Sequence, residues 1–406
     1  MLRFCLVTTF YPPYHFGGDA IFVHRLARAL AERGHSVDVV HSVDAYRLSR
    51  PEPQPGFEET PGVRRLPLVS RSAHVAALLS HQIGGPGPYS RQLREILAPG
   101  RYDVIHFHNI SLVGGPGVLR YGDGIKLYTA HEYWLVCPTH VLFRFDGKAC
   151  FEKSCLRCTL HYRRPPQLWR SSSLIQDCLQ SLDLLLLQSR FAIDRHRAEG
   201  INAPMQLMPG FVPVPAVEPG PVSGEPYFLF VGRLEKLKGL QDLFPMLRGF
   251  PAARLRIAGT GSYEHELRAT AADLPNVEFL GHVHPSRVAD LYRSALAVLV
   301  PSLCFEVFPL AVVEAMACGV PVIARRIGAV TELIEDSGGG ELFDTATECR
   351  AAMERLLTDS TLRSELGARG RTTAIKRWTE DAHLTRYLEL IGELRDKRAT
   401  APVTST

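Results

Sequence analysis

The sequence predicts an α/β protein of two domains, each a doubly wound parallel sheet, that face each other across a cleft. Two observations carry this prediction. Short apolar runs with strand character alternate with helical patterns, and the alternation restarts after a proline-rich stretch at residues 209–226. The chain has 406 residues, of which 46% are hydrophobic and 22% charged, and this suits two or three globular domains.

The elements of the first half follow one another in a regular order. A strand is expected at residues 3–8, and a loop with Gly17 and Gly18 leads into an amphipathic helix at 20–32, which Gly34 ends. Later buried strands are expected at 36–40, 103–107, 127–130 and 184–187. These elements predict an N-terminal domain at residues 1–208.

The second half repeats the pattern after a linker at residues 209–226. Strands are expected at 227–231, 254–258, 277–280, 297–300 and 321–324. They predict a C-terminal domain at residues 227–380. A last helix at 381–397 and a disordered tail at 398–406 complete the chain.

Residues suited to ligand binding gather directly after the predicted strands. In doubly wound sheets, ligands bind beyond the carboxyl ends of the strands. Those positions hold Gly17-Gly18, His131, Gly232-Arg233, Lys238, residues 259–261, residues 281–283 and Glu306. Because so many lie at equivalent places, the sequence predicts a binding site in the cleft between the domains.

The most informative segment carries two carboxylates, Glu306 and Glu314, with a proline between them. Pro309 suits the first position of a helix, where its missing N–H costs nothing, and Gly319 suits the end. Glu306 is therefore expected in the loop before the helix, and Glu314 within it.

This arrangement fits a nucleotide-sugar. The free N–H groups of Leu310 and Ala311 would point out of the helix start and provide a site for phosphate. A carboxylate before the helix suits sugar hydroxyls, and one along its side suits a ribose. The alternative is an ordinary amphipathic helix with two solvated acids.

Two cations follow the first strand of the second half. Arg233 and Lys238 lie in a short segment bracketed by Gly232 and Gly239, where they could hold a departing diphosphate. The alternative is a solvated loop. In the first half, Gly17 and Gly18 would let the backbone approach a diphosphate, and a plain turn is the alternative.

Two motifs are absent from the sequence. It contains no Asp-x-Asp, which argues against a transferase that depends on Mg²⁺. The Gly-Thr-Gly at 259–261 lacks the third glycine of a dinucleotide fingerprint, so a nicotinamide oxidoreductase has little support.

Three histidines lie at the ends of buried strands. His131 stands at a strand end, where an imidazole could polarise a sugar hydroxyl or the reacting centre. A structural histidine bonded to the backbone is the alternative, and it is favoured for His106 and His108.

Four of the nine cysteines are clustered, at Cys137, Cys150, Cys155 and Cys158. The last pair has the C-x2-C spacing of metal ligands, and four thiolates suit a structural zinc ion within an insert at 137–160. An iron–sulfur cluster uses the same ligands, and His140 or His161 could replace a cysteine. A flexible cysteine-rich loop without metal is the alternative.

Charge is distributed unevenly along the chain. Residues 1–215 carry a net charge of +7 and the remainder −3. A basic first half suits an anionic acceptor or peripheral contact with the inner face of a membrane, although scattered surface charge would look the same. No tract suggests nucleic acid, no run is long enough to cross a membrane, and the N-terminus reads as a strand, so a cytoplasmic protein is expected.

Taken together, these motifs resemble those of the family 4 retaining glycosyltransferases, which have the GT-B fold of two Rossmann-like domains. The resemblance covers nearly the whole chain and is strongest at the two glutamates. It implies an enzyme of polysaccharide or glycoconjugate biosynthesis, with a UDP- or GDP-sugar donor, no catalytic metal, and a glycan, lipid-linked or small-molecule acceptor. The cysteine insert occurs in only part of such families.

The resemblance implies roles for individual residues. It assigns a catalytic set of His131, Arg233, Lys238 and Glu306. It assigns a donor-binding set of Gly17, Gly18, Gly232, His282, Val283, Phe308, Leu310, Ala311 and Glu314. The acceptor would bind the first domain, the donor the second, and the last helix would cross back to the first domain. A non-catalytic GT-B module and a GT-B epimerase or phosphorylase remain alternatives.

Overall fold

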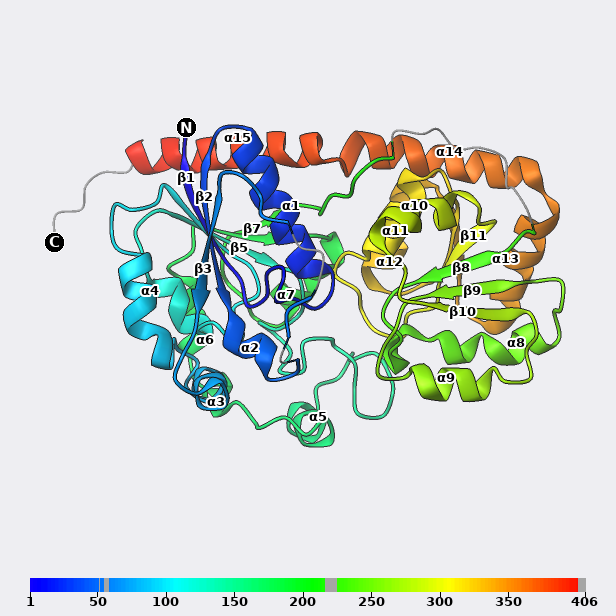
Figure 1. Cartoon of the computed structure of the whole chain (residues 1–406), viewed down its shortest axis with the longest axis horizontal. Helices are drawn as coiled ribbons and strands as arrows, with labels where there is room; N and C mark the ends of the chain where they lie inside the picture. Colours follow the sequence, from blue (N-terminus) through cyan, green and yellow to red (C-terminus); the bar gives the residue numbers. More distant parts are fainter. Residues whose placement is uncertain (51, 55–57, 216–224, 401–406) are drawn as a thin grey trace. The chain divides into compact units, whose positions relative to one another are not determined.

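The computed structural model describes residues 1–50, 52–54, 58–215 and 225–400 (Figure 1). They group into two compact units, and each is described by itself. The first unit consists of Met1–His140, Ser154–Pro209 and His383–Thr406, and the second of Val141–Lys153 and Gly210–Ala382. Residues 216–224 of the expected linker and 401–406 of the expected tail lie outside the described residues.

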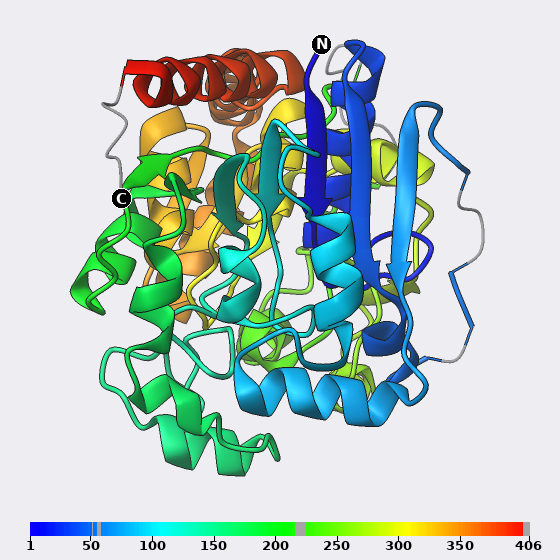
Figure 2. The same cartoon turned by 90° about the vertical axis from the view of Figure 1, so that its left-hand side faces the viewer.

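The first unit is built on a sheet of seven parallel strands in the order β3-β2-β1-β4-β5-β6-β7 (Figures 1 and 2). These strands are β1 Arg3–Val7, β2 Ser36–Ser42, β3 Val63–Leu68, β4 Val104–Phe107, β5 Ile125–Ala130, β6 Leu184–Leu187 and β7 Met205–Leu207. The order reverses between β1 and β4, which pair with each other in parallel. The two strands that the sequence did not predict, β3 and β7, form the edges of the sheet.

Helices connect these strands, as parallel pairing requires. The helices of the first unit are α1 Gly18–Glu32, α2 Val43–Arg47, α3 Ala73–Ile83, α4 Ser90–Ile96, α5 Cys155–His161, α6 Leu174–Leu179, α7 Arg190–Ala198 and α15 Glu380–Thr400. α1 buries Val23, Leu26 and Leu30 on one face, the spacing of an amphipathic helix. Its start at Gly18 is two residues earlier than predicted.

The second unit has six parallel strands in the order β10-β9-β8-β11-β12-β13. These strands are β8 Phe228–Val231, β9 Leu255–Ala258, β10 Val277–Gly281, β11 Ala297–Val300, β12 Val322–Arg325 and β13 Gly340–Phe343. Counted along its own chain, this order is the same as that of the first six strands in the first unit. The unpredicted strand β13 again lies at an edge. Two doubly wound parallel sheets confirm the predicted α/β class.

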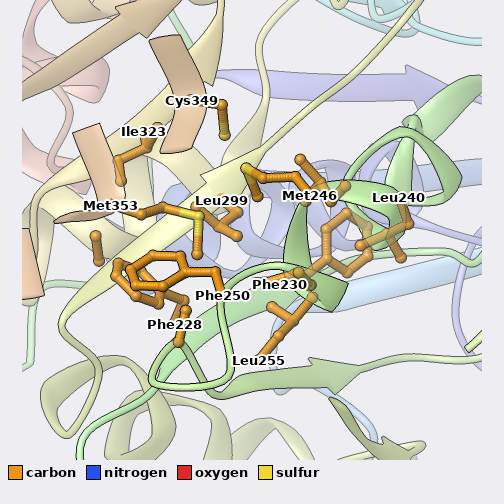
Figure 3. Close-up of a cluster of buried hydrophobic side chains, with 14 of the residues drawn as sticks. Phe228, Phe230, Leu240, Met246, Phe250, Leu255, Leu299, Ile323, Cys349 and Met353 are labelled. Carbon is orange, nitrogen blue, oxygen red and sulfur yellow. The ribbon is translucent and has the colours of Figure 1, made fainter. Parts of the chain in front are cut away.

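The helices of the second unit pack on this sheet. They are α8 Phe244–Arg248, α9 Glu264–Thr270, α10 Pro285–Arg293, α11 Leu310–Ala317, α12 Gly328–Ser337, α13 Ala346–Thr358 and α14 Ser360–Arg377. α13 begins with a capping box, in which the Thr345 side chain and that of Glu348 bond each other's backbone N–H. One core cluster includes Phe228, Leu255 and Met353 (Figure 3), and burial of each such side chain contributes about 1.5–3 kcal/mol.

The long last helix returns to the first unit. α15 runs to Thr400, three residues beyond the predicted end, and residues from His383 onward belong to the first unit. The Tyr387 hydroxyl bonds His106 Nδ1 at 2.9 Å, and Arg398 pairs with Asp183. No helix in the described part of the chain is both long and apolar enough to cross a membrane.

Candidate functional site

The switch point of the second sheet gathers the charged candidates. β8 and β11 lie side by side where the strand order reverses, and ligands of such sheets bind beyond the carboxyl ends of these strands. Gly232 and Arg233 follow β8 directly, and Lys238 ends the short 3₁₀ helix η4, Lys236–Lys238. Glu306 lies in the loop between β11 and α11.

Lys238 and Glu306 form a half-buried ion pair at this switch point. The Lys238 Nζ donates to Oε1 of Glu306 at 2.5 Å, and the Ser302 hydroxyl donates to the same oxygen at 2.8 Å. Burial is the largest single influence and works against both charges, but the opposite charges and hydrogen bonds together outweigh it, so the pKa of Lys238 is raised and that of Glu306 lowered. Both groups therefore stay charged at neutral pH.

Arg233 stands beside this pair but remains accessible. Its side chain is 60% exposed, and its guanidinium bonds Glu235 at 2.7 Å. Because the guanidinium is exposed, it can turn toward a phosphate without breaking a buried contact. The second unit thus presents an accessible cation next to a half-buried one.

Two glycines let the loops pack closely enough to bring these groups together. Gly239 has φ +75, and a Cβ there would lie 2.0 Å from the carbonyl oxygen of Pro301. Gly259 has φ +143, and a Cβ there would lie 1.9 Å from the carbonyl oxygen of Gly232. Gly259 therefore supports the loop that carries Arg233, which gives this glycine a packing function.

Helix α11 carries the second carboxylate, as predicted. The helix starts at Leu310, and Pro309 is its N-cap because its ψ of 102° is extended. The sequence had predicted Pro309 as the first helical residue, so the helix starts one residue later than expected. The first N–H groups of a helix, here those of Leu310 and Ala311, have no partner within it. Glu314 lies in the middle of the helix and accepts a hydrogen bond from the Tyr292 hydroxyl at 3.2 Å.

The remaining donor-site candidates of the second unit differ in exposure. Phe308 is buried and packs edge-on against Trp378, with ring centroids 6.3 Å apart. Val283 packs against a second core cluster, which contains Phe308 and Trp378, whereas His282 is exposed. The Phe308 side chain therefore stabilises the start of α11 by packing and is not itself exposed to a ligand.

Histidines take the place of charges beyond β4 and its neighbour β5 in the first sheet. His131 follows β5, and its Nε2 lies 3.0 Å from Nδ1 of His108, which follows β4. His106, inside β4, bonds Thr129 and Tyr387 through its two nitrogens. Burial lowers the pKa of all three, that of His131 to about 4, so they are neutral at pH 7.

The burial of His108 selects one arrangement of protons. Its Nε2 is buried and has no hydrogen-bond partner. A buried N–H without a partner costs more than a buried lone pair, so the proton of His108 belongs on Nδ1. His108 Nδ1 then donates to Nε2 of His131, and the proton of His131 is placed on Nδ1, as a donor. The ring of Phe22 packs against His131 with centroids 5.0 Å apart and fixes its plane.

The glycine pair lies at the start of α1. Gly17 is the N-cap with φ +78, Gly18 is the first helical residue, and both are exposed. Asp19 in the first turn accepts a hydrogen bond from Asn109 at 3.4 Å, which ties the helix start to the loop after β4. Sequence reasoning missed Asn109 and Ser302, although both follow buried strands, and it had no signal for Tyr292.

The cysteines do not form a metal site in this structure. Among the described residues, no group of three or more His, Cys, Asp or Glu side chains could hold a metal ion. Cys137 Sγ lies 3.2 Å from the Thr139 hydroxyl, and Cys150 belongs to the second unit while Cys155 and Cys158 belong to the first. The four-cysteine zinc site that the spacing predicted therefore has no support from this structure.

Family models match almost the whole chain. Residues 16–214 match the model described as Glycosyltransferase Family 4, and residues 217–373 match that described as Glycosyl transferases group 1. The first match covers the histidines beyond β4 and β5, and the second covers Arg233, Lys238 and both glutamates.

Curated relatives match most of the chain. A D-inositol 3-phosphate glycosyltransferase of Acidothermus cellulolyticus is 29% identical, across 95% of this chain and 87% of the relative. A phosphatidyl-myo-inositol mannosyltransferase of Mycolicibacterium smegmatis is 28% identical, across 88% of this chain and 86% of the relative.

Solved structures share the fold. Sucrose-phosphate synthase of Thermosynechococcus elongatus superposes with a TM-score of 0.75 at 20% identity, across 98% of this chain and all of the other. The Anabaena protein HepE in complex with UDP gives 0.68 at 16% identity, across 97% of this chain and all of the other. These structures establish the GT-B architecture of two Rossmann-like domains.

Proposed function

The chain belongs to glycosyltransferase family 4, and on this premise we propose that it transfers a sugar from a nucleoside-diphosphate donor, with retention at the anomeric carbon. The observation that carries the proposal is the Lys238–Glu306 pair at the switch point of the second sheet. It joins a fixed cation, a carboxylate and a helix start within one short stretch of structure.

The leaving group determines what the second unit must do. When the bond from the anomeric carbon to the phosphate oxygen breaks, the nucleoside diphosphate departs with negative charge. Lys238 and Arg233 would stabilise that charge, together with the N–H groups of Leu310 and Ala311. The acceptor oxygen forms the new bond to carbon, and its proton ends on the departing phosphate.

The two carboxylates would orient the donor. Glu306, fixed by Lys238 and Ser302, would accept hydrogen bonds from sugar hydroxyls, and Glu314, fixed by Tyr292, from the ribose. Backbone groups around His282 and Val283 would meet the base. UDP or GDP is the proposed nucleotide, and the UDP complex of the Anabaena fold neighbour supports this class.

The first unit would bind the acceptor, a glycan, a lipid-linked sugar or a small polar molecule. His131 would act as a neutral hydrogen-bond donor to a hydroxyl near the reacting carbon, because its proton is placed on Nδ1. The relatives include a D-inositol 3-phosphate glycosyltransferase and a phosphatidyl-myo-inositol mannosyltransferase, and they support a polyol acceptor that carries phosphate.

A panel of nucleotide-sugars with purified protein tests the proposal. We expect one UDP- or GDP-sugar to bind and to be hydrolysed slowly without acceptor, and the product formed with acceptor to keep the anomeric configuration by NMR. Binding without turnover of any donor would indicate a non-catalytic module. An inverted product would contradict retention.

Metal-independent catalysis is part of the proposal, because Lys238 and Arg233 supply the positive charge that Mg²⁺ would otherwise provide. Turnover should persist in EDTA, and a loss that Mg²⁺ restores would contradict it. The structural zinc at Cys137, Cys150, Cys155 and Cys158 stays a prediction without structural support. Elemental analysis of protein purified without chelator tests it, and four titratable thiols without metal would end it.

A further inference from the structure

Helix α3 (Ala73–Ile83) exposes its large apolar residues to solvent, unlike an ordinary surface helix. Its buried face consists of the small residues Ala76, Ala77 and Ser80. Large aliphatic side chains point outward instead, and Leu78 and Ile83 are 52% and 55% exposed. A helix that packs only on its core normally buries such residues, since each exposed one forfeits about 1.5–3 kcal/mol of burial energy.

A second segment of the first unit repeats this pattern. α5 (Cys155–His161) buries Cys158 and Thr159, while Leu156 and Leu160 are more than half exposed. Leu168 follows on the 3₁₀ helix η3 (Leu168–Ser171) and is 77% exposed. Of the thirteen large apolar side chains exposed among the described residues, eight lie in these two segments. The exposure is therefore local.

The two segments are joined at one end of the first unit. The indole of Trp169 in η3 donates to the carbonyl oxygen of His81 in α3 at 2.8 Å, and Gly84, just after α3, lies against the Trp169 ring. Both views of the molecule place α3 and α5 at the same end of this unit (Figures 1 and 2). We call this set the α3–α5 surface: Val75, Leu78, Leu79, Ile83, Leu156, Leu160, Tyr162 and Leu168.

Charge in these segments has one sign. Residues 69–89 contain one arginine and residues 154–176 contain four, and neither stretch contains an Asp or a Glu. Arg71, Arg157, Arg163 and Arg164 are exposed. A protein partner of ordinary composition does not call for positive charge alone. An anionic lipid surface does, because basic side chains contact the phosphates while aliphatic side chains enter the boundary of the acyl chains.

We propose that the α3–α5 surface docks the first unit on a membrane that contains anionic lipid. α3 lies in the interface with Leu78, Leu79 and Ile83 turned toward the acyl chains, and the surrounding arginines contact the headgroups. An eleven-residue helix spans about 16 Å, half the thickness of a bilayer core, so it binds at the surface without crossing. This contact is independent of the proposed chemistry of the donor site.

Vesicle co-sedimentation of the full chain tests the surface. The probes are vesicles of phosphatidylcholine alone and of phosphatidylcholine with about 30% phosphatidylglycerol, at about 0.1 M and 0.5 M salt. We expect binding to the anionic vesicles, at least tenfold weaker at the higher salt and at least tenfold weaker to neutral vesicles. The double variant Leu78→Glu/Leu160→Glu should bind the anionic vesicles at the lower salt about tenfold or more weakly than the wild type does.

The matched control is Ile375→Glu, which places the same charge at an exposed aliphatic position on α14 of the second unit and should bind as the wild type does. Absence of wild-type binding to anionic vesicles, or unchanged binding of the double variant, would overturn the proposal. So would a dimer that the double variant dissociates, because the surface would then belong to a second copy. Donor hydrolysis without vesicles should be the same in the wild type and all variants. If the wild type hydrolyses no donor, that result counts against the proposed enzyme function and not against the membrane surface.

Discussion

The two sheets wind in the same order yet carry opposite chemistry beyond the carboxyl ends of their strands. In the first, β4 and its neighbour β5 are followed by the neutral His108 and His131 and the amide of Asn109, and in the second, β8 and β11 are followed by two cations and a carboxylate. The difference shows that the winding decides where a ligand binds, while the residues after the strands decide what it is.

Burial acts on both sites and has a different result in each. It lowers the pKa of His106 and His108, which have no opposite charge beside them and therefore stay neutral. It also opposes the charge of Lys238, but Glu306 compensates and keeps the ammonium protonated. A neutral site suits acceptor hydroxyls, and a charged one suits a diphosphate.

The largest expected effect concerns the charged site. Lys238→Ala or Arg233→Ala should lower turnover about 10²-fold or more, the scale of losing one preorganised donor to developing negative charge. Steady-state kinetics with the preferred donor measures this. Lys236→Ala, an exposed lysine of the same short helix, is the matched control and should keep normal turnover.

A fold control separates chemistry from stability. Lys238→Ala leaves Glu306 half-buried without its main partner, so thermal unfolding should be followed for each variant. Arg233 is exposed, and its variant should melt as the wild type does. Near-normal kinetics for both variants would contradict the assignment of the diphosphate site.

The next expected effect is a difference between the two units in how their stability depends on pH. A group whose pKa is lower in the folded than in the unfolded state costs stability as pH falls, because the unfolded chain takes up the proton first. His131 and His383, both with a pKa of about 4, therefore destabilise the first unit between pH 6.5 and 4. For the buried His383 alone this is about 2 kcal/mol at pH 5.

The second unit should not share this loss. Glu306 has a lowered pKa and Lys238 a raised one, so their pair stays ionised over the same range. Hydrogen exchange at pH 7.5 and 5.0, corrected for intrinsic rates, should show amides of β4 and β5 losing protection while those of β8 and β11 keep it. Equal losses in both units would refute the contrast.

The sequence predicted the central strands well and the edge strands poorly, for a physical reason. A central strand such as residues 184–187 is buried on both faces and reads as a continuous apolar run. β3 carries two arginines and a proline, which an edge strand tolerates and a central one does not. β7 has only three residues, too few for any pattern.

The candidate site could be predicted only as far as local rules reach. Strand ends and a helix start identify Arg233, Lys238 and Glu306, because each lies within a few residues of the element that positions it. The Tyr292–Glu314 contact joins residues 22 apart, on α10 and α11, and depends on how two helices pack. The cysteine spacing is limited for a related reason, since it gives the separation of the four thiols along the chain but not in space.

A smaller effect concerns the histidine site. His108→Phe removes the hydrogen bond that places the proton of His131 and should lower turnover about tenfold without weakening donor binding. His131→Ala should cost at least as much. His108→Asn should recover part of the loss, because its amide N–H can replace Nδ1–H. Equal turnover for His108→Phe and His108→Asn would show that His108 acts by packing alone.

The smallest effect concerns the contact between Tyr292 and Glu314. Glu314→Gln should raise the donor KM about tenfold by weakening the proposed ribose contact, since hydrogen bonds to a charged acceptor contribute about 1.5–3 kcal/mol. Tyr292→Phe removes only the 3.2 Å bond that orients the carboxylate and should raise KM about threefold at unchanged kcat. Isothermal titration with UDP and with uridine tests both variants, because a ribose contact weakens the two ligands alike, whereas a diphosphate contact weakens UDP only. If Glu314→Gln binds UDP as the wild type does, Glu314 serves the packing of α10 on α11, and the second unit binds its donor through the diphosphate and sugar alone.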